Sequence, residues 1–185
     1  MAAPTYNYEV EKEHTQDEIQ YLFVSTGHKD IIKAVQYNYV GNLDEKRIFN
    51  LAFGDYYIET DTIDDEANTA NGDVFKVFNT VLNTIPSFFE IFANEIIVVS
   101  GSDSKLEFIE KCKKECKKNC KEECRKAGRR IGIYRSYVDK NFEVLSNDFV
   151  FYGGNPALEN PQSTLLEPYI VNKKYSSVFI FKNNA

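Results

Sequence analysis

The sequence contains no tryptophan and only two histidines, and none of its apolar runs is long. The histidines, His14 and His28, are too few for a metal site built from imidazole ligands alone. A membrane-spanning helix needs about 18 to 20 consecutive apolar residues, and no run here approaches that length. The opening residues, MAAPTYNYEVEKEH, lack the basic start and the apolar stretch of a secretory signal. We therefore expect a soluble, cytoplasmic protein that does not contact a membrane.

Motifs that would identify an activity are also missing, and the sequence has no internal repeat. Ser100 and Ser102 follow an apolar run, but no G-x-S-x-G sequence surrounds them, so we interpret them as turn residues. Asp61, Asp64 and Asp65 could hold Mg²⁺ or Ca²⁺, yet the glycine and terminal glutamate of an EF-hand are absent. A plain acidic loop is the better interpretation of that segment.

Basic residues are missing from one stretch of the sequence and concentrated in another. Between Ile48 and Phe75 there is no lysine or arginine, but there are seven acidic residues. Between Lys111 and Arg130, ten lysines and arginines stand against three glutamates, a local charge of +7 in a chain of net charge −6. An acidic body with one basic segment can serve as an interaction surface. Residues 111–130 are therefore candidates for contact with a protein or a nucleic acid.

The first part of the chain reads as an antiparallel meander of strands. At 185 residues the chain is long enough for one domain with its own core and short for two. Short runs rich in β-branched and aromatic residues, separated by Gly-Asn and Gly-His turns, are typical of consecutive strands. An acidic surface loop at 59–72 follows the meander. The predicted strands are 6–10, 20–25, 31–40 and 47–53, the last extended past a bulge by 56–58.

The central element is a helix followed directly by a buried strand. Apolar residues recur every three or four positions over 73–92, which predicts a helix with one apolar face. Asn71 or Asp73 suits its N-cap. Pro86 should kink or restart the helix, because proline removes one backbone hydrogen bond. The β-branched run 95–100 then predicts a strand.

The remaining elements complete an α+β fold. We expect one domain over 1–185, with a mainly antiparallel sheet of five to seven strands, the central helix packed on that sheet and a protruding basic helix. The later predicted elements are a short helix at 131–138 and strands at 149–152, 169–171 and 177–181.

This order of elements resembles the C-terminal two-thirds of the acetyl-CoA-dependent N-acyltransferases. In that superfamily a loop before the helix holds the cofactor pyrophosphate, and a tyrosine on the next helix often acts as general acid. The corresponding positions here are residues 68–73, which include Asn71 and Asp73, and Tyr134. The superfamily loop is basic and rich in glycine, whereas this loop has one glycine, no arginine, and in Asp73 a carboxylate that would repel phosphate.

Several short motifs occur in order along the chain: Phe53-Gly54-Asp55, Asp64-Asp65, Asn71-Gly72-Asp73, Thr80-Val81, Gly101-Ser102 and Arg130-x-x-x-Tyr134-Arg135. With these motifs the chain resembles more closely a family of small uncharacterised bacterial proteins of unknown function. This resemblance covers the chain from about Tyr21 to Tyr137 and implies a single compact domain without an established activity. In that family the Gly-Ser pair is followed almost directly by the Arg and Tyr motif, so residues 103–129 look like an inserted helical segment.

The inserted segment carries all four cysteines, at every fourth residue: Cys112, Cys116, Cys120 and Cys124. On a helix the first and last thiols would lie about 18 Å apart, so they cannot surround one zinc ion. Adjacent pairs could bind a soft metal such as Cu(I), or zinc shared with a second copy. A solvated Lys- and Glu-rich helix is the favoured alternative. No aromatic residue lies among the lysines, which weakens the interpretation as a single-strand binder.

Two functions from different classes stay open. The first is a small-molecule-binding or acyl-transfer domain of degenerate acyltransferase type, with Tyr134 as general acid and acetyl-CoA as one cofactor option. A thiolate-bound metal is the other option. The second is a non-catalytic interaction module that uses the acidic face or the basic helix. The candidate ligand-binding residues are Arg130 and Arg135 for an anionic group, together with Asn71, Asp73 and Asp55.

Overall fold

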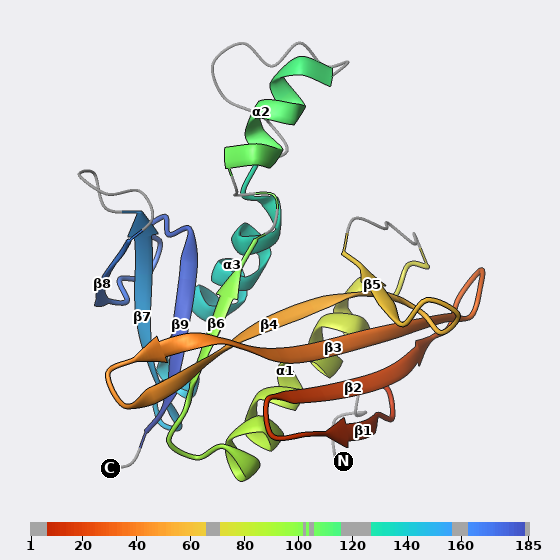
Figure 1. Ribbon diagram of the computed structural model, residues 1–185, viewed down its shortest axis with the longest axis horizontal. Coiled ribbons are helices and arrows are strands. Elements are labelled where there is room, and N and C mark those ends of the chain that lie inside the picture. The colour runs from red at the N-terminus through yellow and green to blue at the C-terminus, as the bar shows by residue number, and fades with distance from the viewer. Residues whose placement is uncertain are drawn as a thin grey trace. The chain divides into compact units, whose positions relative to one another are not determined.

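The structure is a computed structural model (Figure 1). Within the residues it describes, the chain forms nine strands and three helices, and it divides into two compact units, Met1–Glu95 and Ile96–Ala185. The strand pairs within each unit are antiparallel, which confirms the predicted α+β class with a mainly antiparallel sheet. Among these residues no helix is long and apolar enough to cross a membrane. The described residues are 7–65, 71–101, 103, 106–115, 127–156 and 163–183.

In the N-terminal unit, strands β1 to β4 pair in sequence order, β5 pairs with β4, and one helix follows. The three central strands confirm the predicted meander and are longer than expected. The irregular register lies in β3 between Tyr39 and Gly41, and β4 continues through Tyr57 without the predicted bulge. The elements are β1 Glu11–His14, β2 Glu18–Ser25, β3 Ile31–Leu43, β4 Lys46–Tyr57, β5 Thr62–Asp64 and α1 Val74–Ile91.

The predicted edge strand at 6–10 is wrong. Residues 7–10 form no strand, and the edge strand is β1 at Glu11–His14, whose four side chains are all exposed. The sequence EKEH shows no apolar alternation, because β1 joins the sheet through its backbone bonds to β2. The acidic segment 59–72 likewise contains the short strand β5, which the composition did not indicate.

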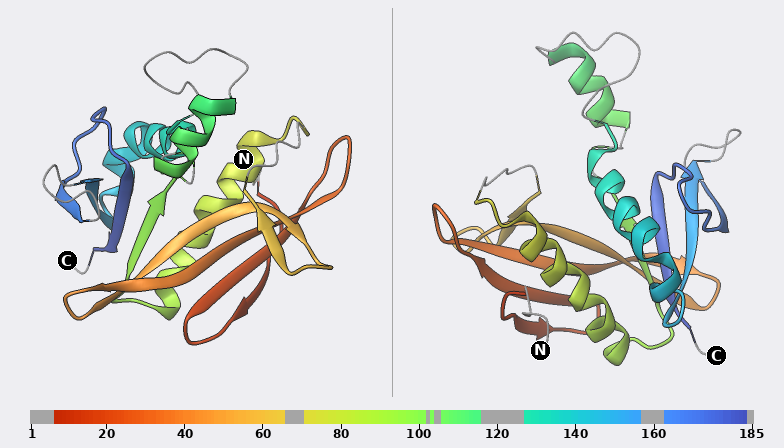
Figure 2. Two further views of the ribbon diagram at one scale, coloured as in Figure 1. Left: turned by 45° about the horizontal axis from the view of Figure 1, so that its top comes forward. Right: turned by 180° about the vertical axis from the view of Figure 1, so that it is seen from behind.

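Helix α1 lies across one face of strands β2 to β4 (Figure 2). Its seven buried residues face a sheet core that includes the fully buried Tyr37 and Phe49. The Tyr37 ring stacks on Phe88 at 4.8 Å, and its hydroxyl lies 2.7 Å from the hydroxyl of Thr84. The helix continues through Pro86, so the predicted restart there is wrong. One missing backbone bond is outweighed because residues on both sides of the proline are buried against the sheet.

The C-terminal unit is a second antiparallel arrangement, in the order β6-β9-β7-β8. Helix α3 confirms the helix predicted at 131–138 and is longer at both ends, and Figure 1 shows α2 extending away from this sheet. The strand predicted at 169–171 is wrong: β8 ends at Pro168, because the Tyr169 ring packs at 5.8 Å against Phe142 of α3. The elements are β6 Ile96–Ser100, α2 Leu106–Glu115, α3 Arg129–Leu145, β7 Phe149–Pro156, β8 Thr164–Pro168 and β9 Ser177–Lys182.

Candidate functional site

Polar side chains gather at one end of the core face of the N-terminal sheet. Lys33 lies two residues before Val35 on β3, and Asp55 lies two residues after Phe53 on β4. Since side chains two residues apart point to the same face of a strand, both charged groups point toward the side that α1 covers. Ser25 ends β2 beside them. All three polar residues are almost completely buried, which is unusual for a lysine and an aspartate.

Lys33 and Asp55 form a buried ion pair. They are direct partners in the β3–β4 register, and the lysine Nζ donates to the aspartate Oδ1. The ammonium also lies 5.7 Å from the centre of the Phe53 ring. Asp55 was predicted from the sequence as a ligand-binding residue, whereas Lys33 was missed. The available signal was a lysine on the apolar side of a predicted strand.

Asn71 ties the segment before α1 to the loop between β2 and β3. Its Nδ2 donates to the Ser25 Oγ at 3.0 Å and to the Lys29 carbonyl at 2.8 Å. The Lys29 N–H in turn donates to the Asn71 Oδ1 at 3.3 Å. Gly27 permits this approach, because a Cβ at that position would lie 2.7 Å from the Asn71 carbonyl oxygen. Asn71 therefore has a positioning role in the site.

Asp73 occupies the N-cap position of α1, as predicted, but its side chain does not cap the helix. Its Oδ2 instead accepts hydrogen bonds from the Ser25 hydroxyl at 2.6 Å and the Tyr8 hydroxyl at 2.8 Å. Burial alone would raise the pKa of Asp73, but these two bonds, its own backbone N–H and the charge of Lys33 together lower that pKa. Asp73 is therefore an ionised carboxylate held from two sides. We name Tyr8, Ser25, Lys33, Asp55, Asn71 and Asp73 the polar cluster.

The surface beside Asp73 is apolar. The first turn of α1 exposes Val74 by 58% and Phe75 by 87%, although both belong to a helix whose other face is buried. The Tyr8 ring stacks on Phe23 at 5.5 Å, and the Lys76 Nζ lies 3.7 Å from its centre. A ligand at Asp73 would therefore meet one fixed negative charge, the exposed apolar side chains of Val74 and Phe75, and the Lys76 ammonium on the ring of Tyr8.

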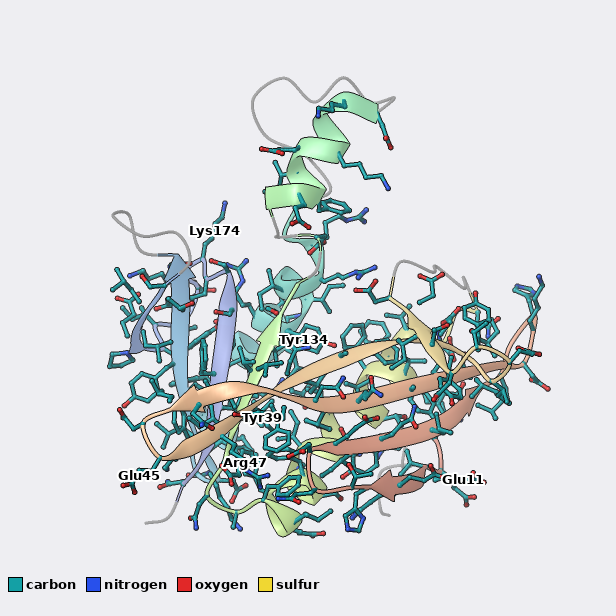
Figure 3. The ribbon with its side chains drawn as sticks, viewed as in Figure 1. Glu11, Tyr39, Glu45, Arg47, Tyr134 and Lys174 are labelled. Atoms are coloured by element: carbon teal, nitrogen blue, oxygen red, sulfur yellow. The ribbon has the colours of Figure 1, made fainter. Side chains whose placement is uncertain are left out.

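The other predicted site residues lie on α3 in the C-terminal unit. Tyr134 is half-buried on this helix (Figure 3), and burial raises the pKa of its phenol while the charge of Arg130 acts in the opposite direction. The Arg130 backbone N–H donates to the Oδ2 of the buried Asp103 at 3.1 Å, so Asp103 satisfies a free amide at the start of α3. Arg135 is half-buried one residue after Tyr134. The roles assigned to these three residues stay predictions.

The structure describes only one of the four cysteines. Cys112 is half-buried on α2, and Cys116, Cys120 and Cys124 lie outside the described residues. In the described part of the chain, no group of three or more His, Cys, Asp or Glu side chains is arranged to hold a metal ion. A thiolate metal site in the inserted segment therefore stays a prediction.

Asp61 in the acidic loop accepts a hydrogen bond from the Tyr56 hydroxyl at 2.7 Å.

The fold and the polar cluster define an α+β domain whose main helix begins at a partly buried group of charged and hydroxyl side chains. The sequence model of a family of unknown function, DUF6934, matches residues 3–108, and the chain belongs to this family. The curated proteins and the solved structures compared with the chain gave no match. The matched residues include the whole polar cluster, whereas Arg130, Tyr134 and Arg135 lie beyond them. The expectation of a family of unknown function is thus confirmed, and bacterial origin stays a prediction.

Proposed function

We propose that the N-terminal unit binds a small molecule that carries a cationic amine, and that Asp73 receives this amine. The observation that carries the proposal is the state of the Asp73 carboxylate. It is ionised, and within the described residues it makes no ion pair, because both of its side-chain partners are neutral hydroxyls that donate to one oxygen, Oδ2. A carboxylate fixed in this way can bind a cation without rearrangement, which lowers the cost of binding.

The apolar first turn of α1 supports an apolar body for this ligand. Phe75 and Val74 directly follow Asp73, and both are exposed to solvent. Small-molecule sites combine mostly apolar lining with a few fixed polar groups. An amine attached to an aromatic or aliphatic body therefore suits this surface better than a compact polyamine.

The order of elements supports an acyltransferase-like layout for the domain. The meander, α1, β6, α3, β7 and β9 come in the order that motivated the comparison, with α2 between β6 and α3 and β8 between β7 and β9. Asp73 argues against a pyrophosphate at the start of α1, because an anion there would meet an ionised carboxylate. Acyl transfer with Tyr134 as general acid is the finer form of the proposal. Calorimetric titration with acetyl-CoA tests it separately, and an absence of heat at millimolar ligand would count against it.

Titration with 2-phenylethylamine tests amine binding, with uncharged 2-phenylethanol as the matched control ligand. The wild-type chain should bind the amine saturably and the alcohol far more weakly. Asp73→Asn should lose the amine binding, whereas Asp30→Asn, which changes an exposed aspartate of the β2–β3 loop, should retain it. Equal amine binding by Asp73→Asn and the wild type would contradict the proposal, as would a folded chain that binds neither ligand.

A second candidate is contact with a protein, and the segment after β4 favours it. Tyr57, the last residue of β4, and Ile58 are exposed by 47% and 65%, and the exposed acids Glu59 and Asp61 lie within the next three residues. Apolar groups flanked by acids suit a partner segment that is basic and partly apolar. A lysine-rich peptide should then bind at low salt and bind more weakly to Glu59→Lys, while Asp73→Asn leaves its affinity unchanged. Unchanged binding by Glu59→Lys would exclude this surface.

A further inference from the structure

Arg135 is a charged side chain whose buried group makes no hydrogen bond. Its Nε is buried, and within the described residues that atom makes no hydrogen bond. Within the described residues Arg135 also makes no ion pair. A guanidinium is always charged, and a buried polar group without a partner loses the hydrogen bond it had in water. This arrangement is therefore unfavourable unless something else binds the arginine.

Asp139, the expected partner of Arg135, accepts hydrogen bonds from other groups. Asp139 lies four residues later on α3, at the spacing where an aspartate can pair with an arginine. Its Oδ1 instead accepts hydrogen bonds from the Tyr169 hydroxyl at 2.9 Å and from the Asn172 backbone N–H at 3.1 Å. Burial and this carboxylate raise the pKa of Tyr169, while the charge of Arg135 acts to lower it, so the three groups lie close together. The Oδ1 of Asp139 therefore has two donors other than the arginine.

Rigid packing surrounds this group. The Tyr169 ring contacts Phe142, Phe151 and Tyr175, with ring centres 5.8, 6.3 and 5.2 Å away. The Tyr175 hydroxyl accepts the backbone N–H of Ile170 at 3.2 Å, which fixes the segment between β8 and β9. Neither Tyr169 nor Asp139 is therefore free to turn toward Arg135 without breaking contacts of this core.

We propose that Arg135 binds the anionic group, a carboxylate or a phosphate, of a small ligand of the C-terminal unit. Both groups present pairs of oxygen atoms that can accept two parallel N–H bonds from a guanidinium. The site lies in a different unit from the polar cluster and outside the residues matched by the family. It therefore stands independently of the amine site proposed above.

Anion titrations at constant ionic strength test this proposal, with inorganic phosphate and malonate as probes and thermal unfolding and calorimetry as readouts. At least one probe should bind the wild-type chain saturably and raise its melting temperature. Arg135→Met, which removes the charge and the donors but keeps the length, should weaken that binding about tenfold or more. Arg135→Lys should retain only part of it, since lysine offers no planar fork. Arg129→Met, at an exposed position of the same helix, is the matched control and should bind like the wild type.

A second readout separates a ligand-binding arginine from a structural one. Without added anion, Arg135→Met should unfold at a temperature equal to or above that of the wild type, because it removes a charge that makes no ion pair within the described residues. A clear loss of stability without anion would show that Arg135 holds the fold and would overturn the proposal. Wild-type affinity of Arg135→Met for the anions, or no saturable binding of either probe to the wild type, would overturn it as well. The probe that binds more tightly identifies the class of anion.

Discussion

At the scale of single residues, Lys33 and Asp55 form the buried ion pair of the polar cluster. Both groups are buried, so removal of Asp55 takes from the buried Lys33 ammonium the carboxylate to which it is bonded. Asp55→Ala should therefore lower the free energy of unfolding by about 3 to 5 kcal/mol, measured by urea denaturation. The double change Lys33→Met with Asp55→Leu should cost clearly less, since no charge stays behind. A double variant as unstable as Asp55→Ala would show that the ion pair itself stabilises the sheet.

Asp73 gives the second prediction at this scale, which concerns pH. Its folded pKa lies below the ordinary value of 3.8, so its contribution to stability is fully present above that pH and is lost as the pH falls through the lower folded pKa. Asp73→Asn removes this contribution. Unfolding free energies of the two proteins should therefore differ most at neutral pH and converge as the solution is acidified below the ordinary pKa of 3.8. A difference that is constant with pH would mean that the Asp73 pKa is not lowered in the folded state.

At the scale of elements, an aromatic ring packs directly against a glycine of strand β7. A Cβ added to Gly153 would lie 2.1 Å from a ring carbon of Tyr175, far inside van der Waals contact. Tyr175 is buried and cannot move away without breaking its contact with Tyr169. Gly153→Ala should therefore cost about 1 to 3 kcal/mol or more in thermal or chemical unfolding.

Gly132 offers the matched control for this substitution. It lies inside α3, where an added Cβ would meet nothing within 4 Å. Gly132→Ala should raise stability by up to about 1 kcal/mol, because alanine favours a helix. If Gly153→Ala left stability as high as Gly132→Ala does, that result would contradict the packing of Tyr175 against β7.

Elements with a regular apolar pattern could be predicted from the sequence. Strands β2, β3 and β4 and helix α1 alternate with their own periods because each buries one face. Strand β1 could not be predicted, since its four exposed side chains carry no such pattern. The boundary of β8 was missed for a related reason. Tyr169 is an aromatic residue that packs in the core, as a strand residue would, although it lies outside the strand.

The polar cluster was only half predictable, because its contacts join residues far apart in the chain. Asp55, Asn71 and Asp73 stood out in short motifs. Tyr8 and Ser25 did not, since their roles come from hydrogen bonds to Asp73 across 65 and 48 residues of sequence. No local pattern records such contacts.

At the scale of the whole molecule, the segment predicted to be an insertion should be dispensable for folding. Its two ends meet: the Gly128 N–H donates to the Asp103 carbonyl at 3.3 Å, and the Asp103 carboxylate accepts the Arg130 N–H. Replacing residues 104–126 by two glycines would keep both contacts. The shortened chain should retain cooperative thermal unfolding, followed by circular dichroism. A shortened chain without a cooperative transition would show that the segment, cysteines included, is part of the structure.

The claim that the N-terminal unit binds a cationic amine at Asp73 is tested most directly by chemical-shift mapping. Backbone amide spectra of the wild-type chain would be recorded during titration with 2-phenylethylamine. The shifts should change in a saturable way at Tyr8, Ser25 and the segment from Asn71 to Phe75, and they should not change in Asp73→Asn. Saturable changes centred elsewhere on a folded chain, or the same changes in Asp73→Asn, would contradict the claim.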